Sequence, residues 1–326
     1  MNTITMLCLF SGFAICLVIA PFLINYLRKL KVRQTERQEG VKSHLETAGT
    51  PTMGGIMILC AFLVSQLFVI AKYPQTVPVL FMTLGFGIIG FIDDYLKVVL
   101  KRSDGLMPRQ KMVGMIALTA VFVVYLWIMR PECLEVILPF TGGKKLAGLA
   151  VRIAATPLAF FAIIGTVNGV NFTDGLDGLA STVTMVAAGF IFAASARLGG
   201  GLEPACAGMI GALAGFLIHN AYPARVFMGD TGSLALGGFV ASCAYLLQMP
   251  LFILLFGVIY LIEVLSVIIQ VTYFKKTGGK RIFKMSPFHH HLELGGWTGF
   301  KWSETRIVVL FALITLFMSV ISWAAM

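Results

Sequence analysis

The chain has 326 residues, of which 58% are hydrophobic and 12% charged, and a formal net charge of +10 at pH 7. An ordinary soluble domain is excluded, because about a quarter of its residues would be charged. The apolar runs are continuous and about 20 residues long, which suits membrane-spanning helices and not the strands of a barrel. The sequence therefore predicts an all-α polytopic integral membrane protein, whose positive charge faces anionic lipid or substrate and not nucleic acid.

Ten apolar segments follow one another and form a single predicted transmembrane domain over residues 1–326. The first segment lacks a basic region in front of it, so it is not expected to be a cleaved signal. Pro250 almost joins the eighth and ninth segments, and nine or eleven spans are therefore also compatible with the pattern. The predicted spans are 3–27, 53–71, 78–96, 112–129, 148–167, 178–196, 204–221, 233–248, 251–274 and 304–325.

Lysine and arginine residues predict the orientation of these spans. If the N-terminus is outside, 18 of the 25 fall in cytoplasmic segments and six in outside segments, so both termini are expected outside. All six aspartates and the run His289–His291 share the side of the 18 basic residues, which predicts an active site at the cytoplasmic face. The predicted cytoplasmic catalytic loops are about 28–52, 96–111, 168–177, 222–232 and 275–303.

The first candidate motif is G-T-P-T-M-G-G at Gly49–Gly55, and the second is F-I-D-D-Y-L-K at the end of the third span. Thr52 and its neighbours either cap a helix or offer hydroxyl and amide groups to an anion. Lys97 lies four residues after Asp93 and three after Asp94, so it can reach either of them on a helix. These carboxylates either form an ion pair at the headgroup level or supply a general base beside a phosphate-binding lysine.

The third motif, V-N-G-V-N-F-T-D-G-L-D-G-L-A, places four polar residues three apart between two apolar spans. Carboxylates at the end of a membrane span are costly unless they meet a cation, water or a polar ligand. The intervening glycines let a phosphate come close. A capped helix start in a solvated loop is the alternative. The four polar residues are Asn168, Asn171, Asp174 and Asp177.

The fourth motif, F-M-G-D-T-G-S, opens the eighth span and surrounds Asp230 with two glycines. It is either a helix cap or a ligand-contacting turn, in which Phe227 stacks on a base and Asp230 holds Mg²⁺ beside phosphates.

The fifth motif, Met285–Glu293, contains three consecutive histidines. These cannot all face one ion on regular backbone, so contacts to phosphate or peptide are expected in place of zinc. In the ninth span, Glu263 or Gln270 is expected to line an internal cavity.

The six cysteines show no metal-ligand spacing, and most of them lie inside apolar runs. Such cysteines are typical of small hydrophobic core side chains. The sequence therefore predicts no disulfide framework.

Together the five motifs resemble those of the phospho-N-acetylmuramoyl-pentapeptide-transferase family, within the superfamily of polyprenyl-phosphate N-acetylhexosamine-1-phosphate transferases. The resemblance runs from about Lys42 to Trp297 and includes the order of the motifs. The version F-H-H-H-L-E at Phe288–Glu293 favours this branch over the sister transferases that use UDP-GlcNAc and polyprenyl phosphate. An ion-coupled transporter would place ionisable groups deep in several spans, where this chain offers only Glu263.

The resemblance implies that phospho-MurNAc-pentapeptide is transferred from UDP-MurNAc-pentapeptide to undecaprenyl phosphate, with Mg²⁺ as cofactor. The products would be lipid I and UMP, in peptidoglycan synthesis at the bacterial inner membrane. A homodimer is a further expectation that the family brings. Because one phosphoanhydride is exchanged for another, catalysis would consist mainly of positioning and charge neutralisation.

The resemblance also implies a role for each candidate residue. Asp230 resembles the Mg²⁺ ligand and Asp93 a base or orienting group for the lipid phosphate, while a nucleophile within the aspartate pair is the alternative. The implied catalytic residues are Asp93, Asp94, Asp230 and His289. The implied nucleotide-binding residues are Asn171, Asp174, Gly175, Leu176, Asp177 and Phe227. The implied phosphate- or donor-binding residues are Thr52, Lys97, Lys111, Asn168, Gly229, Gln270, His290 and His291.

The stretch before the first motif departs from the family pattern. Many members carry a lysine shortly before G-T-P-T that contacts the uridine. Here the stretch reads L-E-T-A at residues 45–48, with Thr47 nearest to the expected position. This contact is therefore expected to be replaced by Lys42 or to be weaker.

Overall fold

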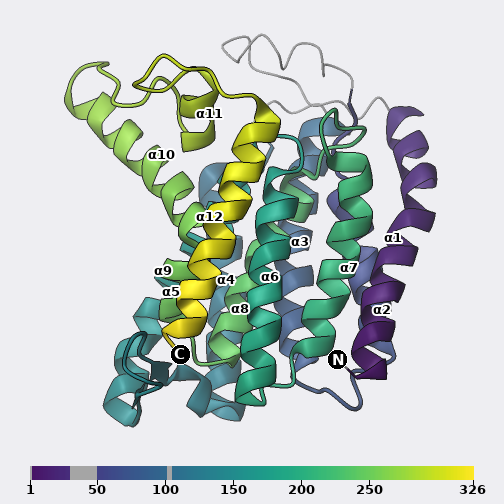
Figure 1. Cartoon of the computed structure of the whole chain (residues 1–326), viewed down its shortest axis with the longest axis vertical. Helices are drawn as coiled ribbons and strands as arrows, with labels where there is room; N and C mark the ends of the chain where they lie inside the picture. Colours follow the sequence, from purple (N-terminus) through teal and green to yellow (C-terminus); the bar gives the residue numbers. More distant parts are fainter. Residues whose placement is uncertain (1, 30–49, 101–104) are drawn as a thin grey trace.

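The computed structural model describes residues 2–29, 50–100 and 105–326, and most of these residues are helical. In Figure 1 the long helices run side by side along the longest axis of the molecule, and both termini lie at the same end. The positions 42–48, where the sequence departs from the family pattern, lie outside the described residues. The helices are α1 (Thr3–Lys29), α2 (Gly55–Leu67), α3 (Thr76–Val98), α4 (Pro108–Met129), η2 (Pro131–Leu134), α5 (Leu149–Thr173), α6 (Leu179–Leu198), α7 (Glu203–Asn220), α8 (Gly229–Leu246), η3 (Pro250–Phe252), α9 (Ile253–Phe256), α10 (Val258–Lys276), α11 (Phe288–Glu293) and α12 (Glu304–Ala324).

Seven helices in the described part of the chain are long and apolar enough to cross a membrane: α1, α3, α4, α5, α6, α10 and α12. The prediction of an all-α, multi-pass membrane protein is confirmed at this level. Each of the ten predicted spans also coincides with a helix, but α2 has only 13 residues. Helix α8 is buried throughout Thr231–Leu246. Because its side chains contact other helices and not lipid, α8 can be less apolar than the seven helices named above. Ten spans and their orientation stay predictions.

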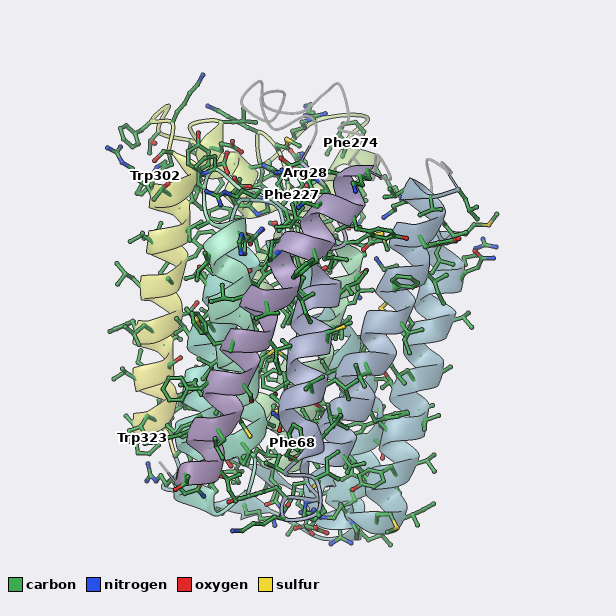
Figure 2. The ribbon with its side chains drawn as sticks, turned by 90° about the vertical axis from the view of Figure 1, so that its right-hand side faces the viewer. Arg28, Phe68, Phe227, Phe274, Trp302 and Trp323 are labelled. Atoms are coloured by element: carbon green, nitrogen blue, oxygen red, sulfur yellow. The ribbon has the colours of Figure 1, made fainter. Side chains whose placement is uncertain are left out.

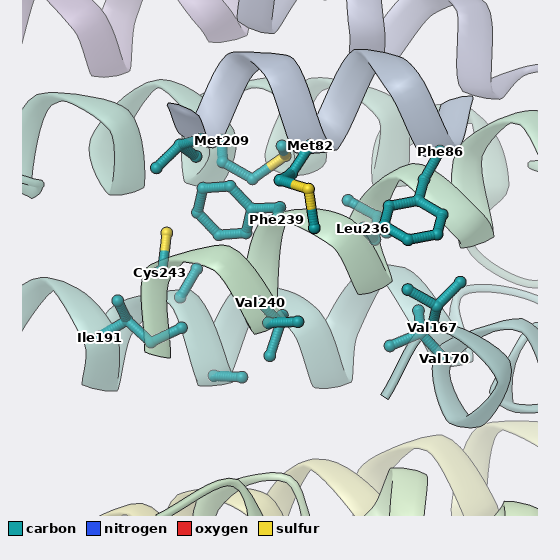
Figure 3. Packing of buried hydrophobic residues seen from close by; sticks show 14 of the residues in the cluster. Met82, Phe86, Val167, Val170, Ile191, Met209, Leu236, Phe239, Val240 and Cys243 are labelled. Carbon is teal, nitrogen blue, oxygen red and sulfur yellow. The ribbon is translucent and has the colours of Figure 1, made fainter. Parts of the chain in front are cut away.

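Helix α8 lies at the centre of the bundle, and small residues let its neighbours approach its backbone. Figure 3 shows Phe239 of α8 packed near Met82 of α3, with Val167 of α5 on another side of the same helix. A Cβ atom on Gly90 of α3 would lie 2.0 Å from the carbonyl oxygen of Asp230. The C-terminal end of α3 is therefore held directly against the N-terminal end of α8. The six cysteines are free, and five of them are buried.

Two of the predicted segments differ from the observed elements. Helix α5 continues to Thr173, so Asn168 and Asn171 lie on a helix and not in a loop. The predicted span 251–274 is divided at Gly257 into α9 and α10, and α10 leans away from the bundle in Figure 1. A side chain at residue 257 would collide with the backbone, since its Cβ atom would lie 2.6 Å from the carbonyl oxygen of Ile253.

The end that carries the termini also carries a short hairpin, a feature that the sequence left open. Strand β1 (Val136–Ile137) pairs antiparallel with β2 (Lys145–Leu146). Figure 2 shows Phe68 and Trp323 at this end, whereas Arg28, Phe227, Phe274 and Trp302 lie at the opposite end. The described parts of the predicted catalytic loops lie at that opposite end (Figure 1).

Candidate active site

Four helices each bring one end to a common polar site. Asp93, Asp94 and Lys97 lie on the last turns of α3, Lys111 on the first turn of α4, Asn171 on the last turn of α5, and Asp230 on the first turn of α8. We call these six side chains the Asp230 cluster. The sequence predicted all six as site residues, and the structure brings them together.

Asp230 is at the centre of the cluster. Its Oδ2 atom is 2.9 Å from the Nζ atom of Lys111 and 3.1 Å from that of Lys97. Its Oδ1 atom accepts a hydrogen bond of 2.9 Å from the amide of Asn171, which also donates to the hydroxyl of Ser233 at 2.8 Å. The Asp230 side chain keeps 19% of its surface exposed, so a ligand can still reach it.

Asp93 faces the same lysines but is more deeply buried. Its Oδ2 atom lies 2.5 Å from Nζ of Lys97 and 4.0 Å from Nζ of Lys111. Its Oδ1 atom accepts the backbone N–H of Leu106 at 2.7 Å. Only 2% of Asp93 is exposed, so this carboxylate acts chiefly on the neighbouring lysines.

Asp94 has a different environment from Asp93, because the two side chains point about 100° apart on α3. Its carboxylate accepts the backbone N–H of Asp230 at 3.1 Å and that of Thr231 at 2.9 Å. It also accepts the hydroxyl of Thr231 at 2.6 Å. A carboxylate in this place satisfies free N–H groups of a helix N-terminus and is favoured by the helix dipole. Asp94 therefore caps α8 and fixes the position of Asp230.

Carboxyl groups outnumber cationic side chains at this site. Asp93, Asp94 and Asp230 face two lysines, and Asp174 lies close enough to feel the same field. Burial, together with the charges of Asp230, Asp94 and Asp177, raises the pKa of Asp174 well above its usual value. A cation bound among these groups would favour their ionised forms.

The donor atoms available for a cation fit magnesium. Among the described residues, no group of three or more His, Cys, Asp and Glu side chains is arranged to hold a metal ion by itself. Mg²⁺ is commonly bound by one or two carboxylates, with water and substrate phosphates as the other ligands. Asp230 is the partly exposed carboxylate of the cluster, so it is the side chain that fits this role.

The first and fourth sequence motifs lie directly against each other beside the cluster. The backbone N–H of Phe227 donates to Pro51 at 2.8 Å, and that of Gly54 donates to Phe227 at 2.8 Å. Gly229 has φ +73°, and a Cβ atom there would lie 2.6 Å from Oδ2 of Asp94 and 2.8 Å from Oγ1 of Thr52. The structure thus places Thr52 and Gly229 next to Asp94, at the edge of the site.

The loop between α5 and α6 is joined to the segment that carries Phe227. The carboxylate of Asp177 accepts the backbone N–H of Ala224 at 2.8 Å, and 7% of Asp177 is exposed. Leu176 is buried beside it, and Phe227 is half-buried. The loop with the predicted residues 174–177 therefore lies next to the segment that carries Phe227, and the carboxylate of Asp177 is already used to hold the backbone of that segment.

The remaining predicted residues contact other groups. The amide of Asn168 donates to the carbonyl oxygen of Ile164 within α5, at 2.8 Å. Nδ1 of His290 lies 3.1 Å from Oε2 of Glu293. The ring of His291 packs against Trp297, with ring centroids 4.4 Å apart.

Two residues that the sequence did not single out complete the cluster. Thr231 binds Asp94 through both its backbone and its hydroxyl, and Ser233 accepts from Asn171. Both lie in the fourth motif. The preference of threonine and serine for the first residues of a helix was the only feature of the sequence that could have indicated their role. Glu304, whose Oε2 atom lies 3.4 Å from the backbone nitrogen of Asp177, gave no such signal because 127 residues separate the two.

Comparisons with known proteins agree with the resemblance of the motifs. Residues 76–248 match the family described as Glycosyl transferase family 4, and residues 48–59 match the Phospho-N-acetylmuramoyl-pentapeptide-transferase signature 1. A phospho-N-acetylmuramoyl-pentapeptide-transferase of Acetivibrio thermocellus is 45% identical over 97% of this chain and 93% of its own length. The protein of that name from Bacillus subtilis is 45% identical over 92% of this chain and 91% of its own length. The one from Clostridium botulinum is 43% identical over 100% of this chain and 98% of its own length.

Proposed function

Because the chain belongs to the phospho-N-acetylmuramoyl-pentapeptide-transferase family, we propose that the Asp230 cluster is its active site. The protein transfers phospho-MurNAc-pentapeptide from UDP-MurNAc-pentapeptide to a polyprenyl phosphate and releases UMP, a step of peptidoglycan synthesis. The observation that supports the assignment of the site is the convergence of Lys97, Lys111 and Asn171 on the single partly exposed carboxylate of Asp230.

Asp230 would hold Mg²⁺ together with water and the diphosphate of the donor. When bound, such an ion neutralises charge on the phosphoryl group and on the departing UMP. The excess of carboxylates over lysines in the Asp230 cluster supports this proposal, since a cation would balance it.

Lys97 and Lys111 would bind the diphosphate. Both lysines now pair with Asp230, and a metal ion bound to Asp230 would release them for the substrate. Their Nζ atoms are held near Oδ2 of Asp230, so both ammonium groups are oriented before the substrate arrives. In phosphoryl transfer the protein contributes mainly such positioning and electrostatic stabilisation.

Asp93 would orient Lys97 and the acceptor phosphate. A phosphate monoester is already largely ionised near neutral pH, so it needs little help from a base. Nucleophilic attack by Asp93 on the donor would require a carboxylate that is only 2% exposed to approach an anionic diphosphate. The geometry supports the orienting role better.

The uridine of the donor would bind between the loop that follows α5 and the ring of Phe227. The bond between Asp177 and Ala224 holds these two segments together. The acceptor, undecaprenyl phosphate, would present its phosphate at the headgroup level of the bacterial inner membrane, beside the cytoplasmic ends of α3 and α8. The homodimer expected from the family stays a prediction.

A donor comparison tests the proposal. Purified protein in detergent would be given undecaprenyl phosphate and Mg²⁺, with UDP-MurNAc-pentapeptide in one sample and UDP-GlcNAc in the other. UMP release with the first donor alone is expected. Release with UDP-GlcNAc alone would move the protein to the sister branch, and no release from folded protein with either donor would contradict the proposed activity.

A further inference from the structure

Helix α10 carries two buried polar side chains on the same face. Glu263 is 0% exposed and Gln270 is 7% exposed. They are seven residues apart, which is about two helical turns, so both side chains point to the same side. An uncompensated carboxylate inside a predicted membrane span is costly, and a specific partner is therefore expected for it.

Both side chains bind the backbone of the segment that returns from the end of α10. Oε1 of Gln270 accepts the backbone N–H groups of Ile282 at 3.1 Å and Phe283 at 3.0 Å. Oε2 of Glu263 accepts the backbone N–H of Phe288 at 2.8 Å, and Oε1 accepts that of His289 at 3.3 Å. Four N–H groups at the two ends of this segment are thus held by one face of α10.

Glu263 also contacts the imidazole of His289. Oε2 of Glu263 lies 3.1 Å from Nδ1 of His289, so the carboxylate packs against the imidazole as well as accepting the backbone N–H of the same residue. His289 is 0% exposed, and its other nitrogen, Nε2, faces the loop after α5. A Cβ atom on Gly175 would lie only 2.2 Å from this Nε2 atom. Glu263, His289 and Gly175 therefore form a continuous line of contact from α10 to the nucleotide loop.

We propose that Glu263 is a positioning residue for nucleotide binding and acts through His289 on the loop at Gly175. This inference rests on the proposed function, because it takes that loop as part of the uridine pocket. The carboxylate holds the backbone at Phe288 and His289 and so positions the imidazole, and the imidazole fixes how closely the loop approaches α11. His289 then serves as a spacer between two segments, in place of the catalytic contact to substrate that the sequence predicted.

Substitution of Glu263 tests the first half of this line. Glu263→Ala leaves the N–H groups of Phe288 and His289 without their acceptor and frees the imidazole. We expect the Kd for UMP and the KM for the donor to rise by about tenfold or more, with a smaller change in kcat. Glu263→Gln should restore part of the affinity, because its carbonyl oxygen can still accept the backbone N–H of Phe288. Ser266→Ala, at a buried hydroxyl one turn further along α10, is the matched control and should bind UMP normally.

Substitution on the other side of the imidazole tests the second half. Gly175→Ala should weaken UMP binding, because the new methyl group occupies the place of Nε2. In the His289→Ala background the methyl group has room, so Gly175→Ala should weaken UMP binding much less there. This non-additivity is expected of groups in direct contact. It also provides a test that does not depend on whether Glu263→Ala folds.

Calorimetric titration with UMP and steady-state kinetics separate the possible outcomes. A loss of kcat in the Glu263 variants with unchanged Kd for UMP would assign His289 to the chemical step and overturn the proposal. Equal effects of Gly175→Ala in both backgrounds would also overturn it. If the unsubstituted protein neither bound UMP nor turned over the donor, the proposed function itself would fail, which is a different result from either of these.

Discussion

The two ends of the bundle stabilise buried carboxylates in opposite ways. At the end with the termini, Glu135 is 6% exposed and lies 2.8 Å from Nζ of Lys145 and 2.5 Å from Nη2 of Arg152. One carboxylate there has two cations. At the other end, three carboxylates of the Asp230 cluster share two lysines.

This difference separates a structural charge cluster from one that is built for a ligand. The group around Glu135 is satisfied within the protein and ties the hairpin to α5. The Asp230 cluster has more carboxyl groups than cationic side chains, and a cation joining it would favour the ionised forms of these groups. The number of carboxylates relative to lysines and arginines in such a cluster is therefore more informative about function than the presence of an ion pair.

The largest effect is expected from Asp230→Asn, which removes charge at nearly constant shape. UMP release should fall by about 100-fold or more, because the anchor for Mg²⁺ is lost from the site of charge development. The measurement is the initial rate of UMP release over a Mg²⁺ titration. Full activity at limiting Mg²⁺ would show that another group holds the metal.

A smaller effect is expected from Lys111→Met, which removes one cation but keeps an apolar side chain of similar length. The KM for the donor should rise by about tenfold, since a charge-assisted contact to the diphosphate is lost. Steady-state kinetics with the donor varied would measure this. An unchanged KM would contradict the phosphate-binding role, and Lys145→Met at the opposite end is the control that should leave the KM unaltered.

Asp94→Asn should separate the two adjacent aspartates. The substituted amide turns an N–H₂ group toward donors of Thr231 or Asp230, so the cap of α8 is weakened at a cost of about 1 to 3 kcal/mol. The apparent Tm should fall together with the rate of UMP release. Asp93→Asn should lower the rate with less loss of thermal stability, and equal thermal losses in the two variants would contradict the division of roles.

The smallest effect concerns Glu135, whose pKa is lowered from its ordinary 4.5 to about 2 by hydrogen bonds with Lys145 and Arg152. A lowered folded-state pKa contributes stability that is present above pH 4.5 and lost as the pH falls toward 2. Glu135→Gln should therefore lower the apparent Tm by about 2 °C at pH 7 and flatten its decline below pH 5. UMP release should not change, and a changed rate would show that the two ends are coupled.

The helices could be predicted because a membrane span is a long continuous apolar run, and such a run is visible in one sequence. Polar residues at helix ends could not be placed in this way. Asn168 and Asn171 suggested a loop, but the amide of Asn168 bonds within α5 and that of Asn171 faces Asp230. Their polarity is satisfied inside the protein, so the helix continues.

Motif chemistry singled out six residues that the structure brings together, but it could not predict how their contacts are divided. On a helix Lys97 is within reach of both Asp93 and Asp94. The choice between them is made by α8, whose N–H groups, 136 and 137 residues away in sequence, occupy Asp94. Of Glu263 and Gln270, one was expected to line a cavity, and Gln270 does so. No feature of the sequence indicated that both side chains also bind the backbone of the segment that returns after α10.

The contact between the first and fourth motifs bears on how the enzyme is made. The backbone N–H of Phe227 donates to the carbonyl oxygen of Pro51 at 2.8 Å, and 176 residues separate the two along the chain. At about 5–20 residues per second, synthesis of that stretch takes about ten seconds or more. Asp93 and Asp94 of α3 are synthesised within that stretch, whereas α8, which Asp94 caps and which carries Asp230, is synthesised only after it. A nascent chain therefore cannot begin turnover until most of the bundle has been inserted.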